Sequence, residues 1–223
     1  MHSNIKAKLA AHFSNPKYIL FLISLVLLII VPPLYSVSDS ATILFDLIYL
    51  IVLFLGSLYT SNSVRNLLIL ISLAIMTYIT HLFLEATSQI KFVNAIFTIS
   101  FFFIVFTNLI KFVLKEKFID ANGIYAAISG YLVLGVMAAP LFYMIERHFP
   151  GAFTIHANYV IYDFIYYSFI TLTTVGLGDI VPIHPFAKAV TIVVSIGGQL
   201  YLTILIAIII GKYMFNFSRK NLE

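Results

Sequence analysis

Two glycines stand two positions apart in residues 173–179, which read Thr-Thr-Val-Gly-Leu-Gly-Asp. Glycine enters the left-handed region of backbone conformation without a steric penalty, so Gly176 and Gly178 can alternate the hand of the chain. Successive carbonyl oxygens can then face one common axis. A ring of closely spaced carbonyl oxygens can replace the water shell of a cation. The two glycines therefore allow the backbone oxygens of this segment to line one axis.

An apolar stretch at 161–174 comes directly before these carbonyls. It is shorter than the roughly 20 residues that a helix needs to cross a bilayer, so it is predicted as a re-entrant helix. The C-terminus of a helix carries a partial negative charge of about half an electron. The end of this helix would therefore favour a cation beside it.

Residues 166–182 read YYSFITLTTVGLGDIVP and resemble the pore signature of potassium channels, usually written T-x-T-T-V-G-Y-G-D-x-x-P. The resemblance implies a selectivity filter at 174–179 that conducts K⁺ as the permeant ion and uses no cofactor. The positions implied to form the filter are Thr174 (with its hydroxyl), Val175, Gly176, Leu177 and Gly178, with Asp179 flanking it and Thr173 facing the cavity below. One chain supplies one filter segment where four are needed, so the resemblance implies a homotetramer.

The flanking residues match the signature with two departures. Tyr166 and Tyr167 match paired aromatic positions that brace the filter in the family, although ordinary interfacial packing is an equal alternative. Leu177 stands where tyrosine is usual. Ile170 stands where several family members carry a carboxylate that pairs with the residue matching Asp179. The partner of Asp179 is therefore open.

The composition indicates a membrane protein. Apolar types make up 61% of the 223 residues and charged types only 10%, whereas an ordinary soluble domain has about 25% charged residues. We expect an all-α integral membrane protein with six transmembrane helices, a re-entrant pore helix and a filter loop. The crossings are predicted at roughly 18–34, 41–59, 66–84, 92–114, 124–146 and 186–211.

The basic residues test this topology, because Lys and Arg concentrate in cytoplasmic loops. With both termini cytoplasmic, ten Lys and Arg lie inside and three outside, which accounts for all 13. A seventh crossing at 161–174 would move Lys212, Arg219 and Lys220 outside and weaken this asymmetry. The net charge of +4 is thus explained by cytoplasmic flanks in contact with the bilayer and predicts no nucleic-acid partner. A small basic chain without cysteine favours a prokaryotic plasma membrane.

Short loops and one polar break divide the chain. Within the last division, a Gly-rich turn lies between two crossings, and non-helical backbone at membrane depth is tolerated only when buried or beside a water-filled path. The predicted parts are a cytoplasmic arm at 1–17, a four-helix voltage-sensor-like accessory domain at 18–114, a linker at 115–123, a pore domain at 124–217 with its inner helix at 186–211, and a tail at 218–223.

The accessory helices lack the charges of a voltage sensor. Residues 92–110 contain no Arg or Lys, and steep voltage dependence requires several charges that move through the field. Asp46 is an intramembrane charge with either a functional role or partial hydration near the outer end. His81 and Glu85, one turn apart, form either a pH-responsive pair or an interfacial hydrogen bond.

The last crossing contains Gly197 and Gly198, which either hinge the helix or permit close packing. A potassium-selective channel without strong voltage dependence is the function implied. A non-selective monovalent cation channel and a non-conducting partner subunit are the alternatives, and a potassium transporter would carry four filter segments in one chain. No nucleophile motif indicates an enzyme. The gating stimulus is not predicted.

Overall fold

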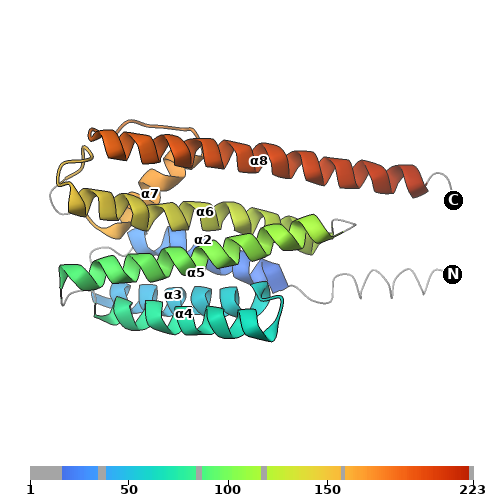
Figure 1. Ribbon diagram of the computed structural model, residues 1–223, viewed down its shortest axis with the longest axis horizontal. Coiled ribbons are helices and arrows are strands. Elements are labelled where there is room, and N and C mark those ends of the chain that lie inside the picture. The colour runs from blue at the N-terminus through green and yellow to red at the C-terminus, as the bar shows by residue number, and fades with distance from the viewer. Residues whose placement is uncertain (1–16, 35–38, 84–86, 117–119, 157–158, 221–223) are drawn as a thin grey trace.

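The structure is a computed structural model that describes residues 17–34, 39–83, 87–116, 120–156 and 159–220. Within these ranges the chain is helical, apart from connecting loops and one isolated bridge between Phe153 and Pro182. The helices run nearly parallel to one long axis, except for the short α7 (Figure 1). They are α2 (Lys17–Leu34), α3 (Asp39–Thr60), α4 (Val64–Leu82), α5 (Ser88–Lys115), α6 (Ala121–His148), α7 (Ile161–Leu172) and α8 (Pro185–Lys220).

Each stretch predicted to be helical is a helix, and its ends lie within four residues of the predicted ends except at the end of α8. α7 ends at Leu172 instead of 174 because Thr173 and Thr174 turn out of the helix. α8 continues to Lys220, nine residues beyond the predicted end at 211. Polarity marks where a helix leaves the membrane, but polar residues do not by themselves end a helix, so hydropathy placed the end of α8 too early. The arm at 1–16 and residues 221–223 lie outside the described part.

Short polar side chains begin three of the helices, by accepting a hydrogen bond from an amide in the first turn. Ser63 accepts from the amide of Asn66 at 3.2 Å, and Thr87 accepts from the amide of Ile90 at 3.3 Å. The Asp120 carboxylate accepts from the amide of Gly123 at 2.8 Å. These caps fix the starts of α4, α5 and α6.

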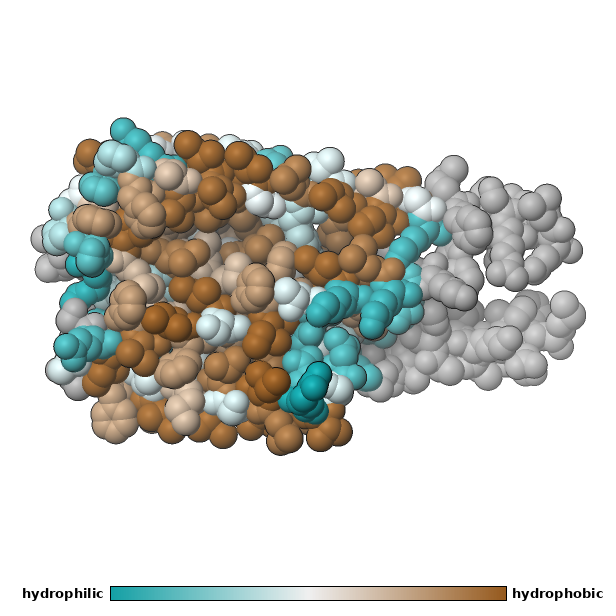
Figure 2. Space-filling model, viewed as in Figure 1, coloured by the Kyte–Doolittle hydropathy of each residue, from teal (hydrophilic) through white to brown (hydrophobic). Residues whose placement is uncertain are grey.

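Four helices are long and apolar enough to cross a membrane: Val64–Leu82, Gln89–Lys115, Ala121–His148 and Pro185–Lys212. The stretches Lys17–Val31 and Leu44–Thr60 are apolar but shorter within the described residues. The space-filling view shows a broad hydrophobic belt with hydrophilic residues toward both ends (Figure 2). Four of the six predicted crossings are thus supported, and the first two stay predictions.

The helices pack in a way that leaves α8 at one side. α5 and α6 are joined by 116–120 and lie antiparallel, while α2 contacts both α3 and α6 (Figure 1). Phe21, Phe101 and Phe102 are fully buried between these helices. α8 contacts α6 and α7, and only 6% of its apolar window is buried, against 56% for α6. Among the described residues, one face of α8 is therefore without packing from its own chain.

Candidate functional site

Residues 173–179 connect α7 to the loop before α8 and are exposed along their whole length. Gly176 and Gly178 have φ angles of +53° and +82°, in the left-handed region. Thr174 also has a positive φ, of +60°. Every second residue from 174 to 178 is therefore left-handed, which is the alternation that turns successive carbonyls toward one side of a chain.

The left-handed backbone at Thr174, a residue already predicted to belong to the filter, was not predicted from the sequence. A non-glycine residue in this region costs on the order of 1–3 kcal/mol and persists only where its surroundings fix it. Its amide donates to the carbonyl of Thr171 at 3.1 Å, and the Gly176 amide donates to the carbonyl of Ile170 at 3.1 Å. The last turn of α7 thus holds the start of the segment. The sequence signal for this left-handed backbone is the position of Thr174 two residues before Gly176, which continues the two-residue spacing of Gly176 and Gly178.

The end of the segment is held by the loop that follows α6. The amide of Thr154 donates to the carbonyl of Val181 at 2.9 Å, and the Val181 amide donates to the Thr154 hydroxyl at 2.8 Å. The buried carboxylate of Glu146 organises this loop by accepting from the amides of Gly151 and Phe153 at 2.8 and 2.9 Å. Sequence reasoning gave Glu146 no such role.

Asp179 has a partner that the sequence left open. The Tyr166 hydroxyl donates to its carboxylate at 2.6 Å. Because this hydrogen bond favours the charged form, it lowers the pKa of Asp179 below the usual value for aspartate. Tyr166 lies one helical turn before Ile170, so both are on one face of α7. The partner of Asp179 is therefore Tyr166 and not the residue at position 170. Ile170 is partly buried among apolar side chains.

Tyr167 faces away from Asp179, into the protein. It is only 3% exposed, and its ring makes edge contacts with Phe142 and Phe153. Its hydroxyl shares a 2.9 Å hydrogen bond with Thr191 of α8. Tyr167 of α7 therefore contacts both α6 and α8.

Small residues let α7 approach its neighbours closely. A Cβ added at Gly135 of α6 would overlap the ring of Phe169, and the Ser168 hydroxyl donates to the Gly135 carbonyl at 2.7 Å. A Cβ added at Gly198 of α8 would lie 2.8 Å from the Leu172 carbonyl oxygen. Gly197 would meet no atom within 4 Å. Gly198 therefore permits close packing of α8 against the end of α7. The helix α8 is continuous at both glycines.

Two further hydroxyl groups donate to backbone carbonyls at the end of α7. The hydroxyl of Thr173 donates back to the carbonyl of Phe169 at 2.7 Å. The Tyr131 hydroxyl of α6 donates to the Leu172 carbonyl at 3.2 Å. At the opposite end of α7, Asp163 accepts from the amide of Val160 at 2.7 Å, where a negative charge suits the helix dipole.

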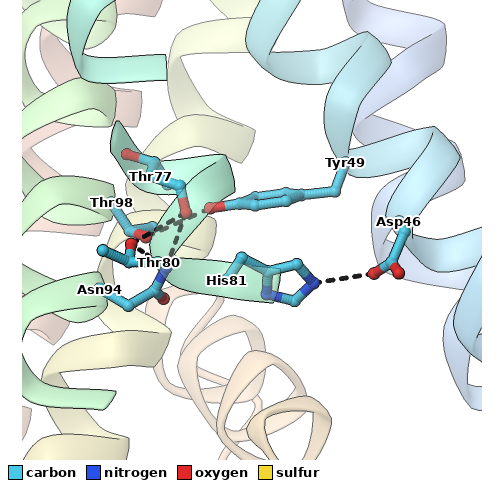
Figure 3. Close-up of polar contacts among 7 residues, drawn as sticks. All are labelled: Asp46, Tyr49, Thr77, Thr80, His81, Asn94 and Thr98. Carbon is cyan, nitrogen blue, oxygen red and sulfur yellow. Dashed lines mark hydrogen bonds and ion pairs between the residues drawn. The ribbon is translucent and has the colours of Figure 1, made fainter. Parts of the chain in front are cut away.

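A separate polar cluster lies among α3, α4 and α5 (Figure 3). His81 and Asp46 approach to 2.8 Å between Nε2 and Oδ1, and the Tyr49 and Thr98 hydroxyls share a 3.2 Å hydrogen bond. Asp46 is thus the carboxylate beside His81, and Glu85, the partner predicted from the sequence, lies outside the described residues. Among the described residues, no three His, Asp or Glu side chains are grouped as metal ligands.

A comparison with protein families finds one match, to the family model described as an ion channel, over residues 130–215. The comparison with curated proteins gave no match. The matched range starts within α6 and includes α7, residues 173–179 and most of α8. Ion channels are a non-enzymatic class of protein. Over these residues the chain is therefore similar to ion channels, which supports passive ion conduction.

Proposed function

We propose that this protein is a potassium-selective channel whose filter is residues 174–179. The observation that carries the proposal is the left-handed backbone at Thr174, Gly176 and Gly178, placed between α7 and α8 in the range that matches ion channels. In this proposal the carbonyls of Thr174, Val175, Gly176 and Leu177 replace the hydration shell of K⁺. Cations below the filter are favoured by the carbonyl end of α7.

The channel is proposed to be a homotetramer. Val175 and Leu177 are 59% and 67% exposed, and the backbone around them has no packing on its outer side within the described chain. Bare peptide groups at membrane depth must line a water-filled path or be buried in protein. Four copies around one axis meet this requirement and also cover the open face of α8.

In the membrane, the proposed arrangement has six crossings with α7 re-entrant, and both termini are cytoplasmic. α2 to α5 form the accessory domain, and residues 124–217 form the pore domain. The accessory helix α5 has no Arg or Lys from 92 to 110, so we propose gating that is not strongly voltage-dependent. The proposed location is the plasma membrane of a prokaryote.

Flux through purified protein in liposomes tests the function. K⁺ uptake and Na⁺ uptake are measured separately for the wild type, for Gly176→Ala and for Gly151→Ala. Gly151 is the matched control because it is also left-handed, with φ +82°, but lies in the loop after α6. Both substitutions place a side chain in a strained backbone region, so they share the folding cost.

The proposal is supported if the wild type shows potassium-selective flux, if Gly176→Ala loses this flux or its selectivity, and if Gly151→Ala keeps both. Equal Na⁺ and K⁺ flux in the wild type replaces it with a non-selective cation channel, for which the absence of a tyrosine hydroxyl at Leu177 is the supporting feature. No flux for either ion, with folded protein, favours a non-conducting partner subunit. Chemical cross-linking in the membrane tests the tetramer separately.

A further inference from the structure

A cavity of about 570 Å³ lies between the accessory helices and the helices of the proposed pore domain. Its volume is within the roughly 300–1,000 Å³ of sites that bind small organic ligands. α2, α3, α4 and α5 contribute to one side, and α6 and α7 contribute to the other. The cavity is therefore a place where a bound molecule would touch both parts of the chain.

Much of the lining is apolar. Ala95 and Phe102 of α5 face Val136, Ala139 and Pro140 of α6. These side chains are small or flat along α6, so they leave room for a narrow apolar chain. The walls therefore suit a hydrocarbon group better than a polar metabolite.

Two basic side chains, Lys91 and Arg147, stand at one end of this cavity. A second cavity of about 90 Å³ shares both of them and continues past Phe92, whose side chain is 54% exposed. The opening is thus at the apolar outer surface, near the start of α5 and the end of α6. Among the described residues, neither cation has a carboxylate within salt-bridge distance.

Four polar side chains that line the cavity, Tyr49, His81, Asn94 and Thr98, already have partners within α3, α4 and α5 (Figure 3). Tyr49 shares its hydrogen bond with Thr98, and the Asn94 amide donates to the Thr77 carbonyl at 2.9 Å. His81, which also lines the cavity, faces the carboxylate of Asp46. An anion is therefore disfavoured beside these polar groups. The basic side chains that could attract an anion to the cavity are Lys91 and Arg147.

We propose that this cavity binds an anionic phospholipid, with the phosphate between Lys91 and Arg147 and one acyl chain along α6. The surrounding membrane supplies a molecule with this distribution of charge and hydrocarbon, and the opening lies on the apolar surface. The proposal concerns a binding site outside the matched pore segment. It does not depend on conduction, because lipid binding is measured without ion flux.

The experiment measures phosphatidylglycerol binding to the detergent-solubilised protein by native mass spectrometry, with phosphatidylcholine as the uncharged comparison. The variants are Lys91→Gln/Arg147→Gln, which removes both charges, and Ala95→Leu, which fills the cavity and keeps the charges. Lys188→Gln is the matched control, because Lys188 is an exposed basic residue at the start of α8 that does not line the cavity. Inorganic phosphate is added as a competitor.

We expect phosphatidylglycerol to bind more tightly than phosphatidylcholine, and the double variant to weaken this binding about thirtyfold, from the usual contribution of two basic groups near an anionic lipid. Ala95→Leu also weakens it, while Lys188→Gln and inorganic phosphate leave it unchanged. Unchanged binding in the double variant overturns the proposal. The proposal is also overturned if inorganic phosphate displaces phosphatidylglycerol and the Ala95→Leu variant binds phosphatidylglycerol as tightly as the wild type. The site would then recognise only the phosphate group and not the acyl chain.

Discussion

The neighbouring glycines of α8 provide a matched pair of substitutions that test how closely α8 packs against the end of α7. An alanine at either position adds one methyl group and improves helix propensity by about 1 kcal/mol relative to glycine. This gain cancels when Gly197→Ala and Gly198→Ala are compared. The difference between the two variants therefore reports the contacts of the added methyl group.

These contacts differ sharply. At Gly198 the methyl carbon would lie 2.7 Å from Cδ1 of Leu172 and 2.8 Å from both its Cγ and its carbonyl oxygen, whereas at Gly197 it would meet nothing within 4 Å. Leu172 is only 2% exposed, and a backbone carbonyl cannot rotate out of the way. Overpacking of this kind costs about 1–3 kcal/mol. We expect Gly198→Ala to be less stable than Gly197→Ala by that amount.

Thermal unfolding in detergent, followed by circular dichroism and by the gel-filtration peak, measures the difference. For a chain of this size it corresponds to a gap of about 2–12 °C in Tm. Potassium flux gives a second measurement, because Leu172 is the last residue of α7 and its displacement moves the turn that starts the filter segment. We expect Gly198→Ala to lower flux and Gly197→Ala to leave it near wild type.

Two results would refute this reasoning. Equal Tm values would show that the packing at Gly198 relaxes without cost or that Gly197 makes equivalent contacts with another copy of the chain. A loss of flux in both variants without a loss of stability would instead support the hinge that the sequence offered as the alternative.

Three further predictions concern contacts between elements. Lys212→Gln removes donors to the carbonyls at the end of α5, where the Lys212 Nζ now lies 2.5–3.1 Å from three of them, and we expect a loss of about 1–3 kcal/mol in thermal unfolding. Tyr166→Phe removes the hydrogen bond that lowers the pKa of Asp179. The stability that this hydrogen bond adds is present above the unfolded pKa of about 4 and is lost as pH falls through the lower folded pKa. The unfolding stabilities of wild type and variant should therefore converge in acid titrations. His81→Gln and Asp46→Asn should each destabilise the protein, with a coupling energy of about 0.5–3 kcal/mol in a double-mutant cycle.

Each of these has a control. Lys188→Gln removes an exposed cation of α8 and should not change stability, so an equal loss in both lysine variants would contradict the role given to Lys212. Tyr125→Phe, whose hydroxyl makes no hydrogen bond within the described chain, should have the same pH profile as wild type. Additive effects of the two changes at Asp46 and His81 would show that these side chains do not interact.

The helices could be predicted from the sequence because a bilayer-crossing stretch is recorded directly in its hydropathy. Their ends could not be predicted equally well. α8 passes from apolar to polar residues at Lys212 without a helix breaker, so polarity placed its end too early. α7 ends early because Thr173 and Thr174 leave the helix, and threonine by itself does not indicate that change.

The candidate site, too, could be predicted only in part from the sequence. The left-handed positions at Gly176 and Gly178 follow from residue type, since glycine is the residue that adopts them freely. The pairing of Tyr166 with Asp179, and of His81 with Asp46, depends on how helices rotate about their axes when they pack. A single sequence gives the face on which a residue lies but not which face of a neighbour it meets.

In the proposed filter, the support that a tyrosine hydroxyl would give at Leu177 must come from the ends of the segment. Before Leu177, the amide of Gly176 is bonded to the carbonyl of Ile170. After it, Asp179 is bonded to Tyr166, four residues before Ile170 on the same helix. Both ends are thus fixed to α7, and Leu177 itself is 67% exposed. Selectivity that depends on the spacing of the carbonyls should therefore be more sensitive to loss of the Tyr166 hydroxyl than to a change of Leu177 to another apolar residue.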